Sequence, residues 1–132
     1  MGGAQAATRQ RVLIVDDDES MRLLLAGMVS SQLDARVELA GTCEQALRLA
    51  EGQPYDAILL DLLMPGIGGF AVLRRVRASA PNARTPVIVV SADKAAAERT
   101  LAAGANAFLV KPVQTAEVAA IIRKHMEGRS HA

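Results

Sequence analysis

The sequence contains little of the chemistry on which several classes of protein depend. It has one cysteine, which excludes an internal disulfide and a zinc site built from several cysteines. Its only aromatic residues are one tyrosine and two phenylalanines, which disfavours a stacking platform for bases or sugars. Lysine and arginine number 15 against 14 aspartates and glutamates. Neither a basic nucleic-acid-binding domain nor an acidic disordered tail is therefore expected.

Signals for export or membrane insertion are also missing. Residues 1–10 are small and polar, without the apolar segment of a signal peptide, and Ala6 stands where a myristoylation motif needs Ser or Thr. No apolar run approaches the roughly 20 residues of a membrane span. We therefore expect a cytoplasmic protein that binds neither a membrane nor nucleic acid directly.

Five short apolar runs of strand type recur along the chain, and neighbouring runs begin 20 to 30 residues apart. They are Val12–Val15, Val37–Leu39, Ala57–Leu60, Val87–Val90 and Ala107–Val110. Between them, apolar residues repeat every three or four positions, as they do in amphipathic helices. This alternation predicts an α/β fold, in which helices cover both faces of a parallel sheet. The second run is the most polar and is expected at an edge of the sheet.

Polar residues mark several helix ends. Asp18 is expected to cap the first helix, and Thr42 with Gln45 forms a capping-box pattern at the second. Thr115 is the candidate cap of the last helix, and Gly104 is expected to end an Ala-rich helix over 94–103.

With 132 residues, the chain has the length of one domain with its own core. No linker divides it. Residues 10–127 are predicted to form this domain, and residues 1–9 and 128–132 are predicted to be flexible termini.

The polar residues that directly follow the strands carry the chemistry. Ligands of open α/β sheets bind beyond the carboxyl ends of the strands. Asp16 and Asp17 follow the first apolar run, Asp61 the third, Ser91 the fourth and Lys111 the fifth. Three carboxylates, a hydroxyl and an ammonium group should therefore converge at one edge.

Such a group of residues suits phosphoryl transfer. Clustered carboxylates repel one another unless a cation lies among them, and hard oxygen ligands with room for water suit Mg²⁺. A lysine and a serine hydroxyl suit the oxygens of a phosphoryl group. With a metal and a positive side chain nearby, a carboxylate can act as the nucleophile. We therefore expect that Asp61 can become an aspartyl phosphate.

At these positions the sequence resembles the receiver domains of two-component response regulators. Among these it is most similar to the stand-alone receivers, such as the chemotaxis regulators. The matching segments are LIVDDDESMR (13–22), ILLDLLMPGIGG (58–69), VVSAD (89–93) and FLVKP (108–112). The resemblance implies a flavodoxin-like (βα)5 fold, a doubly wound parallel sheet of strand order 2-1-3-4-5. In that order the first and third strands are neighbours, which brings the three aspartates together.

The resemblance also implies a role for each matched residue of the acidic group. Asp61 matches the phosphoacceptor. Asp17 matches a direct Mg²⁺ ligand, and Asp16 matches a ligand that acts largely through water. Asp61 itself and the backbone carbonyl of Leu63 match the remaining protein ligands of the metal.

Four further residues match positions around the phosphoryl group. Ser91 matches the hydroxyl that bonds to it after activation, and Lys111 matches the lysine that contacts a phosphoryl oxygen. The bond from Lys111 to Pro112 is typically cis in the family. Phe108 matches the aromatic switch residue, which turns inward when Ser91 moves.

The implied function is that of a single-domain switch rather than an enzyme, since it catalyses only its own phosphorylation and dephosphorylation. The donor would be a phosphohistidine on a sensor histidine kinase or a histidine phosphotransfer protein. The output face would be the fourth helix, fifth strand and fifth helix, and would include Lys94, Glu98, Arg99 and Phe108. Its target would be a protein bound in trans, either as the end of the pathway or as the next step of a relay. The resemblance leaves open a phosphorylation-dependent dimer.

Three residues depart from the family pattern. Gly68 replaces the common Asp or Asn and is expected to loosen the loop after Asp61. Phe108 replaces the common Tyr, so no phenol can bond to a partner. Leu63 places an apolar side chain beside the phosphoryl pocket, and we expect this to slow attack by water on the aspartyl phosphate.

Two other functions fit the sequence less well. The first is dinucleotide binding, because Gly66–Ala71 matches the pattern G-x-G-x-x-G/A with Asp93 about 20 residues beyond. Met64 and Pro65 separate these glycines from the preceding strand, however, so the tight turn that such a site needs is absent. The second is a phosphatase, because the DxD of Asp16 to Asp18 is similar to that of haloacid-dehalogenase-type phosphatases. Those enzymes need a further acidic pair beyond the lysine, and here only Glu117 and Glu127 follow Lys111, both in a predicted helix.

A third alternative, a constitutive interaction module that needs no phosphorylation, stays open. The intact set of site residues argues against it without excluding it.

Overall fold

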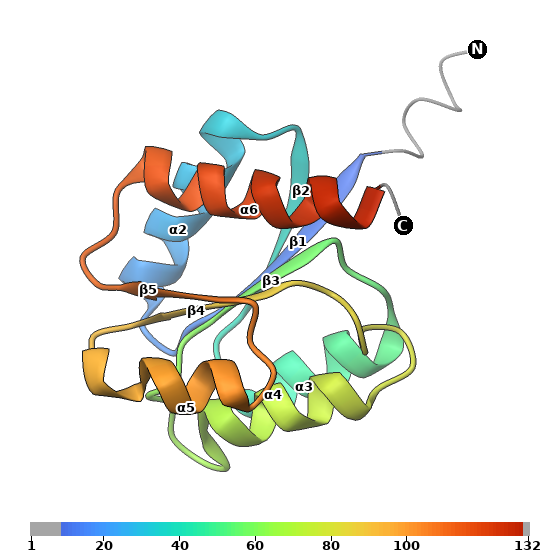
Figure 1. The fold of residues 1–132 in the computed structure, drawn as a ribbon, viewed down its shortest axis with the longest axis vertical. Coiled ribbons are helices and arrows are strands. Elements are labelled where there is room, and N and C mark those ends of the chain that lie inside the picture. The colour runs from blue at the N-terminus through green and yellow to red at the C-terminus, as the bar shows by residue number, and fades with distance from the viewer. Residues whose placement is uncertain (1–8, 131–132) are drawn as a thin grey trace.

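The computed structural model describes residues 9–130, in which strands and helices alternate (Figure 1). The strands are β1 (Gln10–Val15), β2 (Ala35–Ala40), β3 (Ala57–Leu60), β4 (Val87–Ser91) and β5 (Ala107–Val110). The helices are α2 (Glu19–Gln32), α3 (Cys43–Gly52), α4 (Gly68–Ala78), α5 (Ala97–Ala102) and α6 (Thr115–Ser130), and a 3₁₀ turn, η1 (Lys94–Ala96), leads into α5. Residues 1–8 and 131–132 lie outside the described residues, so the flexible termini and the domain bounds 10–127 stay predictions.

The five strands form one parallel sheet of order β2-β1-β3-β4-β5, which confirms the predicted fold and the place of β2 at an edge. Helices α2 and α6 cover one face of the sheet, and α3, α4 and α5 cover the other (Figure 1). Within the described residues, no helix combines the length and the apolar character that crossing a membrane requires.

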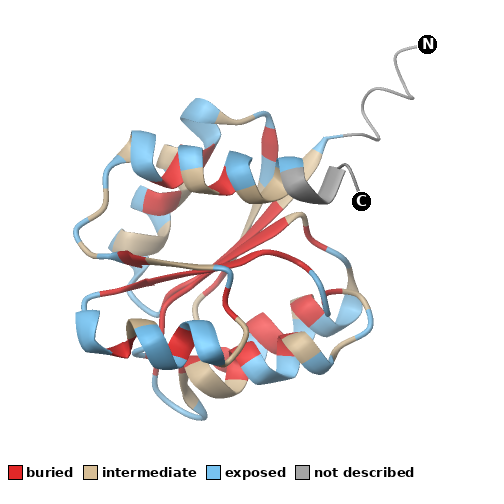
Figure 2. Cartoon of the chain, viewed as in Figure 1, coloured by how far each residue is buried: buried red, intermediate tan, exposed pale blue. Residues whose placement is uncertain are grey.

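The sheet divides the hydrophobic core into two clusters. Successive side chains of a strand point to opposite faces, so Leu13 packs in one cluster and Ile14 in the other. Strands β3 and β4 are buried at every position because helices cover both of their faces (Figure 2). The polar residues that end these strands are therefore held at the rim of a rigid, fully packed layer.

Three of the predicted helix signals are confirmed. The Asp18 carboxylate accepts a hydrogen bond from the amide of Met21, and the Thr42 hydroxyl accepts one from the amide of Gln45. Gly104 follows α5 with a φ of +114°, a left-handed conformation that favours glycine.

The predicted cap at Thr115 is wrong by one residue. Helix α6 begins at Thr115, and its first backbone bond runs from the amide of Val118 to the carbonyl of Gln114, so Gln114 is the cap residue. The Glu117 carboxylate accepts a bond from the amide of Gln114 (3.4 Å). The acidic half of a capping box is thus present without the hydroxyl half that the sequence pattern suggested.

A buried polar network closes the amino end of the sheet. Asn82 is fully buried, and its side-chain oxygen accepts bonds from the amide of Tyr55 and the hydroxyl of Thr85 (2.8 Å each). Its amide nitrogen donates to the carbonyls of Ala50 and Gln53. These bonds connect the end of α3, the start of β3 and the approach to β4, at the opposite end of the strands from the predicted site.

Candidate functional site

The three predicted carboxylates meet at the carboxyl end of the sheet. Asp16 and Asp17 follow β1 and Asp61 follows β3, and these two strands are neighbours. One carboxylate oxygen from each residue lies within 4.8 Å of the others. Asp16 and Asp61 are buried, with 1% and 5% of their surface exposed, whereas Asp17 is exposed. The site therefore has two buried carboxylates and one that faces solvent.

Lys111 joins this group from the end of β5. Its Nζ atom lies 3.0 Å from Oδ2 of Asp16 and 3.7 Å from Oδ2 of Asp61. The ammonium group thus bridges the two buried carboxylates and offsets part of their repulsion. The peptide bond from Lys111 to Pro112 is cis, as the resemblance to receiver domains implies.

Ser91 lies at the same edge, between Asp61 and Lys111 in strand order. It is the last residue of β4, it is fully buried, and its carbonyl accepts a bond from the amide of Lys111 (2.9 Å). Its hydroxyl accepts a bond from the amide of Asp93 (3.1 Å), so here it organises the loop that follows β4.

Burial raises the pKa of Asp61 above its ordinary value. The neighbouring charges of Asp16 and Asp17 act in the same direction. The backbone amide of Leu63, which donates to Asp61 across 3.2 Å, and the charge of Lys111 act against it. The amide of Leu63 and the charge of Lys111 therefore do not fully offset the cost of ionising the buried Asp61 carboxyl group.

The chemistry of these donors fits a magnesium ion. Three carboxylates and one ammonium group leave two negative charges, and all three acidic ligands are hard oxygen donors. A divalent cation held by Asp16, Asp17 and Asp61 would supply the missing charge, and the exposed side of Asp17 leaves room for water.

The acidic segment is held by a residue that the sequence reasoning missed. Arg22 donates from Nη1 to the backbone carbonyl of Asp16 (2.9 Å), and the amide of Asp18 donates to the Asp16 carboxylate (2.9 Å). The guanidinium passes over Gly41, where a Cβ atom would lie only 2.7 Å from Nη1. No local pattern signals this contact, because Arg22 and Gly41 belong to different βα units.

The loop between β3 and α4 is shaped by glycines. Gly66 and Gly68 have φ values of +89° and +85°, which explains glycine at position 68, where the sequence departs from the family pattern. Gly69 has a different reason. A Cβ atom there would lie 2.5 Å from the carbonyl oxygen of Asp61 and 2.5 Å from Cα of Leu62. The start of α4 thus packs directly onto the backbone of the expected phosphoacceptor.

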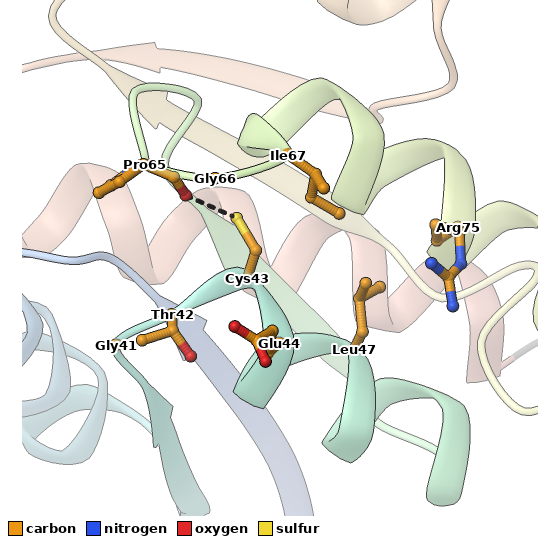
Figure 3. Close-up of a pocket in the computed structure, with 9 residues that line it drawn as sticks. All are labelled: Gly41, Thr42, Cys43, Glu44, Leu47, Pro65, Gly66, Ile67 and Arg75. Carbon is orange, nitrogen blue, oxygen red and sulfur yellow. Dashed lines mark hydrogen bonds between the residues drawn. The ribbon is translucent and has the colours of Figure 1, made fainter.

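A cavity of about 510 Å³ lies beside this loop, between the loop and α3 (Figure 3). Leu47 and Ile67 form apolar parts of its wall, and the thiol of Cys43 donates to the carbonyl of Pro65 (3.5 Å). None of the three clustered aspartates lines it. Cys43 is buried, in agreement with the packing role expected from the sequence.

Comparison with known proteins finds a family model that matches most of the chain. Residues 12–123 match the family model of the response regulator receiver domain. The chain is 40% identical over 119 residues to the gliding motility regulatory protein of Myxococcus xanthus, covering 89% of this chain and 15% of that protein. It is 31% identical over 118 residues to a probable chemotaxis protein CheY of Rhizobium etli, covering 88% of this chain and 92% of that protein.

A solved structure agrees with both. The receiver domain of a sensor histidine kinase of Pseudomonas aeruginosa has 34% sequence identity and a TM-score of 0.83, with 91% of this chain and 99% of that chain covered. That crystal structure contains a magnesium ion coordinated in the active site cleft. The Myxococcus protein is much longer than this chain, which spans only 15% of its length.

Proposed function

The chain belongs to the family of response regulator receiver domains, the signalling switches of two-component systems, and from this premise we propose that it accepts a phosphoryl group on Asp61 with the help of Mg²⁺. The donor is a phosphohistidine of a sensor histidine kinase or a histidine phosphotransfer protein. One observation carries the proposal: a buried aspartate lies within 4.8 Å of two other carboxylates and 3.7 Å from a lysine ammonium group.

Each residue has a distinct part in the transfer. A carboxylate oxygen of Asp61 attacks phosphorus, the bond from phosphorus to the donor nitrogen breaks, and the imidazole retains the electron pair. Lys111 lies close enough to Asp61 to neutralise an oxygen of the incoming group. The amide of Leu63 holds one oxygen of Asp61 in place. Mg²⁺, when bound, supplies positive charge to the transferring group.

The proposed ligands of Mg²⁺ are the carboxylates of Asp16, Asp17 and Asp61 and the backbone carbonyl of Leu63. The two buried carboxylates are fixed by Lys111 and by the amides of Asp18 and Leu63. The site is thus preorganised before a cation enters it. The magnesium-bound receiver domain of the Pseudomonas kinase supports this assignment.

The response to phosphorylation is proposed to pass through Ser91 and Phe108. Ser91 pairs with Val110 between β4 and β5, and Phe108 pairs with Val89 in the same ladder. A movement of the Ser91 hydroxyl toward the phosphoryl group would disturb its bond to Asp93 and the loop that leads into α5. Phe108 is half-buried and packs against the hydrophobic cluster on the face of the sheet that α3, α4 and α5 cover.

The proposed output face is formed by α5, β5 and α6, and it binds a protein target in trans. Lys94, Glu98 and Arg99 are exposed there. The chain acts as a cytoplasmic single-domain regulator, a role supported by the CheY relative, 92% of whose length it covers. Its chemistry is limited to its own phosphorylation and dephosphorylation, and dimerisation on phosphorylation is an outcome that size-exclusion chromatography of both states would show.

Intact-mass spectrometry after incubation with Mg²⁺ and acetyl phosphate tests this function. The wild-type protein should gain one phosphoryl group, and Asp61→Asn should gain none. Asp18→Asn is the matched control, because asparagine caps helices as well as aspartate does and Asp18 lies outside the carboxylate cluster. It should be phosphorylated like the wild type.

Three results would contradict the proposal. An adduct that persists in Asp61→Asn would place the modification elsewhere, and an adduct that forms equally well with EDTA would remove the metal from the reaction. A wild-type protein that gains no adduct, even from a phosphorylated histidine phosphotransfer domain, would favour the constitutive interaction module.

A further inference from the structure

Helices α4 and α5 lie on the same face of the sheet (Figure 1). A shallow groove of about 420 Å³ lies between them. Phe70 and Arg74 of α4 line one side, and Arg99 of α5 and Ala103, just beyond α5, line the other. Each pair is four residues apart, so its members lie on the same side of their helix. We call this the Arg74–Arg99 groove.

The two arginines that line the groove have no ion-pair partner among the described residues. Arg74 and Arg99 are both exposed, and within residues 9–127 neither forms an ion pair, whereas their neighbour Arg75 is paired with Glu51 (2.9 Å). Helix α4 contains no acidic residue. Two guanidinium groups on opposite walls of one groove repel each other, and an anionic group between them would convert that repulsion into attraction.

Arg99 is also held in a conformation that can bind a carboxylate. Its guanidinium lies over the ring of Phe70, with 5.4 Å from Cζ to the ring centroid. A cation–π contact of this kind uses none of the guanidinium N–H groups, which remain available to an anion. The contact also restrains the side chain, which reduces the conformational entropy lost when an anion binds.

We propose that the Arg74–Arg99 groove binds an acidic segment of a protein partner. Two carboxylates of the segment pair with Arg74 and Arg99, and an apolar side chain between them packs on Phe70 and Ala103. An exposed ion pair contributes only about 0–1 kcal/mol, and an open groove does not remove water from a small ion. Useful affinity therefore requires several contacts at once, which a peptide segment provides.

This groove shares Arg99 with the output face proposed above but extends away from that face. Phe70 and Arg74 belong to α4, which lies outside the α5-β5-α6 face, and the groove is complete in the protein without any change at Asp61. The proposal does not depend on phosphorylation, and it stands or falls separately from the proposed function.

Fluorescence anisotropy at low ionic strength tests the groove with a short labelled peptide in which glutamates flank a central leucine and phenylalanine. A second peptide with glutamine at every glutamate position is the matched probe. The wild-type protein should bind the glutamate peptide, and affinity should fall about tenfold in the double variant Arg74→Gln/Arg99→Gln. Both arginine side chains are exposed, so folding should be unaffected, which thermal unfolding checks.

The control is Arg48→Gln/Arg84→Gln, which removes the same net charge from exposed positions outside the groove. It should retain most of the affinity. An equal loss in both double variants would show that only net charge matters and would overturn the proposal. So would equal binding of the glutamine peptide, no binding of the glutamate peptide, or displacement of the peptide by inorganic pyrophosphate at similar concentration.

In the supporting outcome, NMR spectra of the arginine side chains should agree with the binding data. The Nε–H signals of Arg74 and Arg99 should shift as the glutamate peptide is added, while that of Arg84 should stay in place. Shifts of Arg84 as large as those of the groove residues would identify non-specific binding and overturn the assignment.

Discussion

Replacing Gly69 by alanine should disturb both the stability and the chemistry of the site. The φ of Gly69 is not positive, so an alanine there has no backbone strain to overcome. The obstacle is space. The new Cβ atom would lie 2.5 Å from the Asp61 carbonyl oxygen, 2.5 Å from Cα of Leu62 and 2.9 Å from the Leu62 carbonyl oxygen.

The size of the effect follows from these contacts. Ordinary contacts begin at about 3.4 Å, so the backbone of α4 and that of Asp61 must separate by about 0.9 Å. The obstructing atoms belong to the main chain at the end of the buried strand β3, and no side-chain rotation can relieve them. Overpacking of this kind costs about 1–3 kcal/mol, and the rigid surroundings place Gly69→Ala near the upper end. That corresponds to a fall in Tm of about 5–12 °C.

Thermal and urea unfolding of Gly69→Ala measure this cost, and Gly27→Ala is the control. Gly27 lies within α2, and nothing lies within 4 Å of the position that a Cβ atom would take, so alanine there should stabilise the protein by about 0.5–1 kcal/mol. Phosphorylation by acetyl phosphate should slow in Gly69→Ala and not in Gly27→Ala. A Gly69→Ala protein as stable and as reactive as the wild type would refute the contact between α4 and Asp61.

Three further substitutions have expected outcomes. In EDTA at neutral pH, Asp61→Asn should be more stable than the wild type, because burial raises the folded-state pKa of Asp61 and its ionised form therefore disfavours folding. This advantage should appear as the pH rises above the ordinary pKa of aspartate and vanish below it; urea unfolding at a series of pH values that shows no trend would contradict the assignment. Leu63→Asn should shorten the lifetime of the aspartyl phosphate, since the exposed Leu63 side chain keeps an attacking water from being positioned, and equal decay rates would remove that idea. Asn82→Ala should cost about 3 kcal/mol in urea unfolding through its lost buried hydrogen bonds, with unchanged Mg²⁺ affinity because Asn82 lies at the other end of the sheet.

The sequence, with its resemblance to receiver domains, was sufficient to predict the sheet and to predict which side chains meet at its carboxyl edge. Parallel strands end at one edge, so residues that directly follow strands are brought together once the strand order is known. The strand order itself came from the resemblance to receiver domains. Asp16, Asp61 and Lys111 could then be placed without knowledge of a single distance, and the structure puts their charged atoms in contact.

The contacts that could not be predicted join residues whose proximity depends on the final packing. Arg22 turns back over Gly41 to hold Asp16, and Gly69 lies against the backbone of Asp61. Neither glycine differs in the sequence from one that merely ends a helix or forms a turn. The cap of α6 was misplaced for a related reason, since a local pattern contains a hydroxyl at 115 but does not show where the helix begins.

The uniform burial of β3 and β4 has a consequence for how the strands find their alignment. Apart from Ser91, every residue of these two strands is apolar, whichever face of the sheet its side chain is on. If β4 slid by one position along β3, aliphatic side chains would therefore still fill both halves of the core. Hydrophobicity therefore does not choose between the two alignments. The choice falls to hydrogen bonds that join the start of β3 to the approach to β4. The amide of Tyr55 donates to the side-chain oxygen of Asn82, and the hydroxyl of Thr85 donates to the carbonyl of Tyr55. The buried polar network at the amino end therefore also fixes the alignment of the two central strands.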